Sequence, residues 1–134
     1  MFVDTLGLLL AVVVTAAHVQ DRAGAESLLA CLQHQFSRVR CIWADQAYTG
    51  DLVTWVWGLR PWRKVRLEIV KRPEGTHGFL LLPKRWVVER TFAWLGRYRR
   101  LAKDYEYLTQ TSEAMIRVAM IRLMVHRLAH MTCF

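Results

Sequence analysis

The sequence predicts one α/β domain spanning residues 1–134. A chain of 134 residues suits a single domain with one hydrophobic core. Hydrophobic residues make up 54% of it and charged residues 22%, which is typical of a globular protein and excludes a disordered one. Short β-branched and apolar runs alternate with longer segments of helix-forming composition. We therefore expect strands and helices to share a core.

The chain opens with two expected strands. Phe2–Leu6 and Leu8–Thr15 are rich in Val, Leu and Ala, and Gly7 between them suits a tight turn. Periodicity alone leaves a buried helix open as the alternative there. Asp21–Phe36 has the composition of a helix that packs on the sheet, with Asp21 as its expected N-cap.

Two further strands and a short helix follow. Val39–Ala44 is a β-branched and apolar run that stops at Asp45. A loop over Tyr48–Asp51 then opens a helix that continues through Trp57. Val65–Val70 alternates apolar and charged residues, as a half-exposed strand does.

A loop and two long helices complete the chain. Lys71–Leu82 contains one Pro and two Gly and predicts a loop or crossover. Pro83 should open a long helix whose apolar face continues to Leu101. The last helix is expected over Glu113–His130, starting after Thr111–Ser112.

The positive charge is concentrated in the middle of the chain. The sequence has 19 basic and 11 acidic residues, a net charge of +8. Residues 60–103 hold 13 of the basic and 3 of the acidic ones, whereas residues 1–59 hold 3 and 5. Basic residues interleaved with Trp and Tyr suit a surface that neutralises phosphates and stacks on bases. Small basic proteins also arise without such partners, so charge alone only favours nucleic acid.

The cysteines indicate a reducing compartment. Cys31, Cys41 and Cys133 are odd in number and form no C-x-x-C pair, which argues against a disulfide framework or a zinc site. We interpret Cys31 and Cys41 as small buried residues. The apolar run Leu6–Ala17 is too short to span a bilayer and follows Asp4 where a signal peptide would carry basic residues.

Two histidines near the end have the spacing of a helical metal site. His126 and His130 stand four residues apart. No H-E-x-x-H pattern or third ligand accompanies them. We interpret both as solvated residues or residues at the edge of the core.

Three carboxylates occupy unusual places. Asp4 lies within an apolar strand, Asp45 directly follows another, and Glu89 lies in a Trp-rich helix four residues after Arg85. Taken singly, the aspartates are turn residues or caps, and Glu89 forms an ion pair worth about 0.2–0.5 kcal/mol. Together, they could converge at a sheet edge and bind two divalent cations about 3.5–4 Å apart for in-line phosphoryl transfer. Oxygen ligands select magnesium or manganese.

A resemblance to a known family becomes specific here. The segment Arg85–Glu106, RWVVERTFAWLGRYRRLAKDYE, resembles the C-terminal signature of bacterial insertion-sequence DDE transposases. The resemblance extends through Val3–Gly7, Val12–Thr15 and Ala44–Gly50, so it covers nearly the whole chain. The three acids follow in the expected order Asp, Asp, Glu.

The resemblance implies a fold and a site. The fold would be ribonuclease-H-like, with a mixed sheet flanked by helices and long C-terminal helices. Asp4, Asp45 and Glu89 would be the catalytic residues and the ligands of two Mg²⁺ or Mn²⁺ ions. Arg85 matches an arginine that the family places four residues before the glutamate, and it would contact DNA or orient the carboxylate.

The chain departs from the family pattern on either side of the glutamate. Related branches carry a Tyr seven residues before it and a Lys seven after it, where this chain has Leu82 and Gly96. Helical geometry would bring Arg97 or Arg100 close enough to replace the missing cation at a DNA phosphate. Trp86 is our candidate for stacking on a base, although tryptophans more often belong to a core.

The resemblance also implies an activity. The chain would be the catalytic domain of a DNA transposase, performing metal-dependent strand cleavage and strand transfer at insertion-sequence ends. The family has an N-terminal helical DNA-binding region before the first Asp, and only three residues precede Asp4, so we expect residues 1–134 to be an incomplete domain.

Two other functions stay open. An inactive or repurposed transposase remnant would act only as a basic DNA-binding protein. An unrelated small RNA-binding protein would fit the charge but leave the ordered acids unexplained. If the chain is a transposase, the expected partner is DNA, both as transposon ends and as target, and no membrane is involved. The expected protein partner is either a second copy of the chain or a separate N-terminal DNA-binding polypeptide. The expected location is the bacterial cytoplasm, at the nucleoid.

Overall fold

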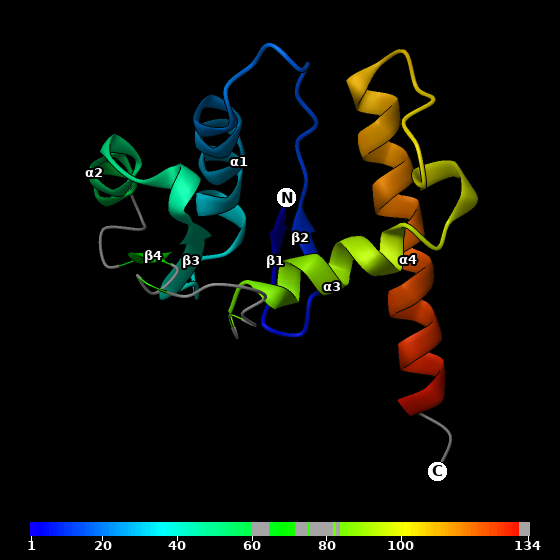
Figure 1. Cartoon of the computed structure of the whole chain (residues 1–134). Helices are drawn as coiled ribbons and strands as arrows, with labels where there is room; N and C mark the ends of the chain where they lie inside the picture. The colour runs from blue at the N-terminus through cyan, green and yellow to red at the C-terminus, as the bar shows by residue number, and fades with distance from the viewer. Residues whose placement is uncertain (60–64, 72–74, 76–81, 83, 132–134) are drawn as a thin grey trace. The chain divides into compact units, whose positions relative to one another are not determined.

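The chain is an α/β protein made of two compact units. The computed structural model describes all residues except 60–64, 72–74, 76–81, 83 and 132–134 (Figure 1). The first unit comprises residues 1–16 and 87–134, and the second comprises residues 17–86. The described residues form two separate two-stranded sheets, one antiparallel and one parallel.

The first unit begins with a short antiparallel hairpin. Strands β1 (Phe2–Val3) and β2 (Leu9–Ala11) pair with a register irregularity between Phe2 and Val3. Gly7 has φ +80°, a conformation that favours glycine, so the expected tight turn is confirmed. Both strands are shorter than predicted: residues 4–8 between them bond to one another within the turn, and β2 ends at Ala11.

The helix that carries Glu89 is shorter than the sequence predicts. Helix α3 (Trp86–Leu95) ends well before Leu101, which belongs to a separate 3₁₀ turn, η2 (Arg99–Leu101). The Gly96 amide makes the last helical bond, to the Phe92 carbonyl at 2.8 Å. The next two amides bond only three residues back, which closes the helix with a tightened turn.

Helix α4 (Thr109–Met131) is the longest element and starts four residues earlier than predicted. Glu113 fixes its first turns to the chain that follows β2, since the Val14 amide donates to Glu113 Oε1 at 3.0 Å. Arg117 also bonds Glu113, at 3.0 Å.

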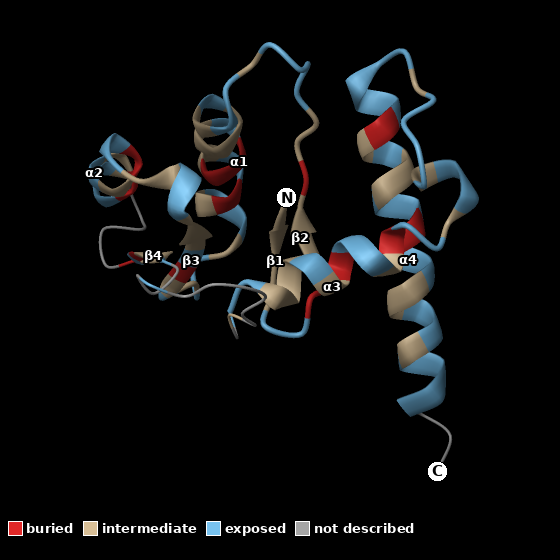
Figure 2. Cartoon of the chain, viewed as in Figure 1, coloured by how far each residue is buried: buried red, intermediate tan, exposed pale blue. Residues whose placement is uncertain are grey.

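One face of α4 builds the core of the first unit and the opposite face is exposed. The buried cluster consists of Leu95, Ala119 and Met120. Partly buried residues around it are Met1, Leu8, Leu9, Tyr98, Leu101, Ile116, Leu123 and Met124. A second apolar row, at alternating spacings of three and four residues, is mostly exposed (Figure 2): Val118, Ile121, Val125 and Leu128. Helix α4 therefore has an apolar stripe that the described residues do not bury.

The second unit joins two helices to a parallel strand pair. Helix α1 (Asp21–Gln35) precedes β3 (Cys41–Asp45), and α2 (Asp51–Gly58) precedes β4 (Arg66–Val70). Strands β3 and β4 are in continuous parallel register from Cys41–Arg66 to Asp45–Val70. Apolar side chains from all four elements are buried: Leu28, Leu29, Leu32, Ile42, Leu52, Val56 and Leu67. Each of these elements lies where the sequence predicts it, within two residues.

The expected N-cap of α1 and the expected burial of two cysteines are wrong. The N-cap of α1 is Gln20, without a side-chain cap bond, and Asp21 is the first helical residue. Cys31 is exposed, since the buried residues of α1 are Leu28, Leu29 and Leu32, and Cys41 is only partly buried. Most of the loop predicted over Lys71–Leu82, and Pro83, lie outside the described residues. No helix within the described part of the chain is long and apolar enough to span a bilayer.

Candidate functional site

Asp4 organises the turn between β1 and β2. Its Oδ1 accepts hydrogen bonds from the backbone amides of Leu6 at 2.9 Å and Leu8 at 2.8 Å. The Asp4 amide donates to the Leu8 carbonyl at 2.9 Å, and the Gly7 amide donates to the Asp4 carbonyl at 3.0 Å. Asp4 therefore has the turn-forming role that is the simpler reading of its position. Both side-chain bonds use Oδ1, and an ionised carboxylate can accept further bonds at its other oxygen.

The turn that follows Asp4 is held against helix α3. Thr91 is fully buried, and its hydroxyl oxygen lies 2.8 Å from the Gly7 carbonyl oxygen and 3.0 Å from that of Val87. Arg90 donates from Nη2 to the Leu6 carbonyl at 2.9 Å. These contacts join the segment that carries Asp4 to the helix that carries Glu89.

Glu89 lies on the exposed side of α3. It precedes Thr91 by two residues, so the two side chains leave the helix about 160° apart. The structure therefore brings together the segments that carry Asp4 and Glu89, while Glu89 projects from a different face of α3 than the one that contacts the turn.

Asp45 ends strand β3 in the second unit. Its backbone is extended, and Oδ1 accepts from the Ala47 amide at 3.0 Å, which caps the 3₁₀ turn η1 (Gln46–Tyr48). Arg22 of α1 donates to the Thr49 carbonyl at 2.9 Å and so fixes the end of this turn. Burial, followed by the charges of Asp21 and Asp45, raises the pKa of Tyr48. Asp45 thus lies at a well-anchored strand end, again in the role of a cap.

The three predicted metal ligands are distributed over both units. Asp4 and Glu89 belong to the first unit and Asp45 belongs to the second. Within the described ranges, no three His, Cys, Asp or Glu side chains gather into a metal cluster. The donor chemistry nevertheless suits hard cations, because all three side chains offer carboxylate oxygens.

Arg85 and Trp86 lie at the start of α3. Both backbone amides donate to the Leu82 carbonyl at 3.0 Å, which begins the helix. Arg85 is exposed in the turn before the first helical residue, and Trp86 is half-buried. Both residues therefore precede Glu89 by about one helical turn.

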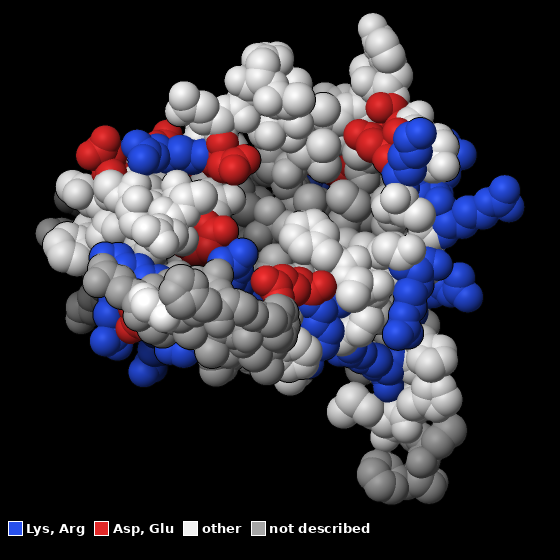
Figure 3. All heavy atoms as spheres, in the orientation of Figure 1, with Lys and Arg blue, Asp and Glu red and all other residues white. Residues whose placement is uncertain are grey.

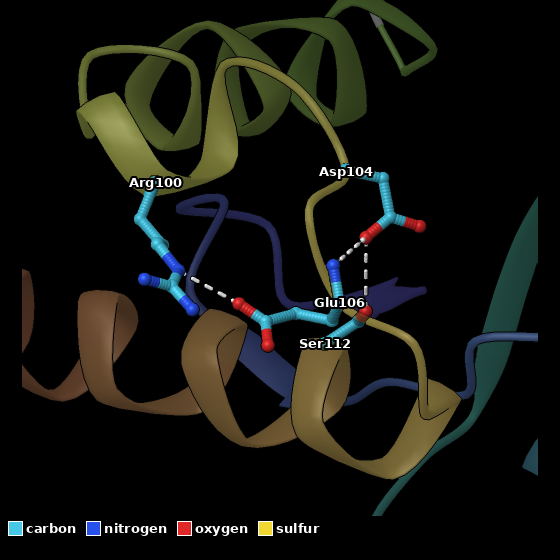
Figure 4. Close-up of polar contacts among 4 residues, drawn as sticks. All are labelled: Arg100, Asp104, Glu106 and Ser112. Atoms are coloured by element: carbon cyan, nitrogen blue, oxygen red, sulfur yellow. Dashed lines mark hydrogen bonds and ion pairs between the residues drawn. The ribbon is translucent and has the colours of Figure 1, made fainter.

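The placement of Arg97 and Arg100 differs from the prediction. Both lie beyond Leu95, so neither shares a helix with Glu89, and the helical argument for placing them beside it is wrong. Arg100 Nε instead contacts Glu106 Oε1 at 2.7 Å (Figure 4). Asp104 holds the segment that carries Glu106 in place. Its Oδ1 accepts hydrogen bonds from the Glu106 amide at 3.1 Å and from the Ser112 hydroxyl at 3.2 Å.

Sequence reasoning missed an arginine stack on Trp94. The guanidinium groups of Arg90 and Arg127 lie 4.8 and 4.3 Å from the centre of a Trp94 ring. Arg122 lies 5.8 Å from the Tyr98 ring. The i, i+4 spacing of Arg90 and Trp94 could have indicated the first contact, whereas those made from α4 depend on tertiary packing. Figure 3 shows Lys and Arg side chains gathered along the edge that α3 and α4 form in the first unit.

Comparisons with known proteins show the family of the chain. The sequence profile of the family described as "Transposase DDE domain" matches residues 1–124. A Burkholderia cepacia protein named as a transposase for insertion sequence element IS402 is 32% identical over 111 residues, which is 77% of this chain. The chain spans 50% of the length of that relative. No solved structure matches this chain significantly. The chain belongs to the DDE transposase domain family of insertion sequences.

Proposed function

We propose that this chain performs metal-dependent DNA strand cleavage and strand transfer at the ends of an insertion sequence. The observation that carries the proposal is the contact of Thr91 with the Gly7 carbonyl, which joins the Asp4 turn to the helix of Glu89. Membership of the family supplies the class of reaction. The proposed fold is a ribonuclease-H-like one.

The proposed catalytic residues are Asp4, Asp45 and Glu89. Each would offer carboxylate oxygens to one or both of two Mg²⁺ or Mn²⁺ ions. The capping bonds to Asp4 and Asp45 occupy Oδ1 in each case, and they would fix the direction of the remaining oxygen. Metal ions bound to these carboxylates would supply Lewis-acid chemistry, which would ease deprotonation of a water or a 3′-hydroxyl and neutralise charge on the leaving oxygen.

Residues at the start of α3 and in the segment that follows it would bind the DNA backbone. Arg85, Trp86, Arg97 and Arg100 are the proposed DNA-binding residues. Arg97 is exposed in the turn that follows α3, where it can reach a phosphate. Arg100 is held by Glu106, so its contribution to phosphate binding should be smaller.

A cleavage assay with isosteric variants tests the activity. The substrate is a supercoiled plasmid that carries both ends of the element, incubated with Mg²⁺ or Mn²⁺. Asp4→Asn, Asp45→Asn and Glu89→Gln should each abolish nicking and strand transfer while DNA binding persists. Asp51→Asn is the matched control, because its carboxylate is 97% exposed and plays no part in the proposed site.

Iron-mediated cleavage of the protein tests the site without relying on activity. Fe²⁺ can replace Mg²⁺ at carboxylate ligands, and with ascorbate and peroxide it cuts the backbone near the bound ion. Cuts near residues 4, 45 and 89 that excess Mg²⁺ suppresses would support the site. Cuts elsewhere, or none within these segments, would refute it.

A second function is a basic DNA-binding remnant without catalysis. It is favoured by the capping roles of Asp4 and Asp45, which need no metal ion. DNA binding with ordinary salt dependence, but no metal-dependent nicking at any protein concentration, would establish this alternative.

The proposed partners are the DNA ends, the target DNA, and either a second copy of the chain or a separate N-terminal DNA-binding polypeptide. The exposed stripe on α4, formed by Val118, Ile121, Val125 and Leu128, supports a protein partner, because apolar rows at this spacing pack against other helices. We place the protein in the bacterial cytoplasm at the nucleoid, where its DNA substrate lies.

A further inference from the structure

We propose that His126 and His130 form a two-imidazole chelate for a divalent transition-metal ion on helix α4. The two residues are exposed and stand one helical turn apart near the end of the helix. Their Nε2 atoms lie 3.1 Å apart, and their ring centroids are separated by 4.3 Å. The two Nε2 atoms, which are hydrogen-bonded to one another, thus lie close enough to bind one ion in place of that bond.

The separation of the nitrogens fits a shared metal ion. Imidazole nitrogens bind zinc at about 2.0–2.1 Å, which puts two ligands of a tetrahedral site about 3.4 Å apart and adjacent ligands of an octahedral site about 2.9 Å apart. The observed 3.1 Å lies between these values. Small rotations of exposed rings would therefore suffice to bind an ion, with no movement of the backbone.

The surroundings leave the pair accessible. Arg127, between them in sequence, packs on Trp94 at 4.3 Å, so its charge is engaged on another face of α4. Neither histidine belongs to the buried cluster of the first unit. The described residues offer no third His, Cys, Asp or Glu at this point, so water would fill the remaining positions.

The ligand chemistry sets this site apart from the carboxylates. Imidazole suits Ni²⁺, Cu²⁺ and Zn²⁺, whereas carboxylate oxygens suit Mg²⁺ and Mn²⁺. The inference therefore does not rest on the proposed transposase activity. The two proposals can fail separately, since one is tested by nickel binding and the other by magnesium-dependent cleavage.

Calorimetric titration of the full chain with Ni²⁺ tests the proposal. Cys31→Ser and Cys133→Ser are introduced in every sample to remove thiols that would compete for the metal. One nickel ion should bind per chain, and excess Mg²⁺ should not displace it. Either His126→Gln or His130→Gln should weaken binding about tenfold or more, because the second ligand no longer acts at a high effective concentration.

Two controls separate chelation from the mere presence of imidazole. His34→Gln removes an exposed histidine from α1 and should leave nickel affinity unchanged. The double change Val125→His with His126→Gln keeps the number of histidines but spaces them five residues apart, which points the rings in different directions and should abolish the chelate. Far-UV circular dichroism confirms that each variant is folded.

Acid provides a further readout, since imidazole binds metal only when it is neutral. Nickel bound at about pH 7.5 should be released at about pH 5. Equal nickel affinity in the wild type and His126→Gln, or retention of nickel in the respaced variant, would overturn the proposal.

Discussion

The Thr91 hydroxyl lies 2.8 Å from the Gly7 carbonyl oxygen, in a place from which solvent is excluded. This bond connects residues 84 positions apart in the sequence. It holds the Asp4 turn against α3, the helix that carries Glu89.

Replacing Gly7 should destabilise the protein. An added Cβ would lie 2.8 Å from Thr91 Oγ1, and the φ of +80° disfavours any side chain. We expect Gly7→Ala to lower the free energy of unfolding by about 1–3 kcal/mol, measured by urea denaturation. Gly58→Ala is the matched control, because a Cβ there meets nothing within 4 Å. It should be neutral or stabilise the end of α2, and an equal loss in both variants would contradict the steric argument.

Removing the Thr91 hydroxyl should also weaken the first unit. Thr91→Val keeps the volume but leaves the Gly7 carbonyl without its donor, which should cost about 1–3 kcal/mol in urea denaturation. Thr54→Val on the exposed side of α2 is the control and should change stability little. If Thr91→Val were as stable as the wild type, the bond would not hold the turn in solution.

Arg97 and Arg100 should contribute unequally to DNA binding. Each phosphate contact adds about 0.9 to the slope of log affinity against log salt concentration. Arg97→Gln should reduce the magnitude of that slope by about 0.9, the value of one phosphate contact. Arg100→Gln should reduce it less, because Glu106 already neutralises Arg100 at 2.7 Å. Fluorescence anisotropy with labelled DNA at several salt concentrations measures both slopes. Equal losses would show that DNA displaces Glu106 from Arg100.

The contact between Trp43 and Glu68 should make stability depend on pH. The Trp43 indole donates to Glu68 Oε2 at 2.8 Å, and it is the first cause of the lowered pKa of that carboxyl, followed by the charges of Lys84 and Arg66. A carboxyl whose pKa is lower when folded stabilises the protein above its ordinary pKa of about 4.3 and loses this effect as pH falls through the folded value.

Trp43→Phe should therefore flatten the dependence of unfolding free energy on pH in the acid range. Urea denaturation at steps from about pH 6 to 3 measures it. The difference from the wild type should be small, because Glu68 is solvent-accessible. Trp57→Phe, at a tryptophan that is 60% exposed, should leave the curve unchanged. Parallel curves for Trp43→Phe and the wild type would contradict the assignment.

Local pattern was sufficient for most secondary structure. The apolar runs placed β3 and β4, and helix-forming composition placed α1 and α4, because burial of one face imposes a period on the sequence. The local pattern failed to predict the end of α3 before Gly96, because the apolar face of the predicted helix continues past the point at which the helix ends. Periodicity records which residues are buried, and it does not distinguish a continuous helix from a helix followed by a 3₁₀ turn.

The sequence by itself determined the family, the order of the three acids and the basic block, since these are properties of residue type and spacing. The tertiary structure decided which side chains meet. It paired Arg100 with Glu106, stacked Arg90 and Arg127 on Trp94, and gave Asp4 and Asp45 their capping bonds. Such contacts depend on where helices end and how segments distant in the chain pack, which no local pattern specifies.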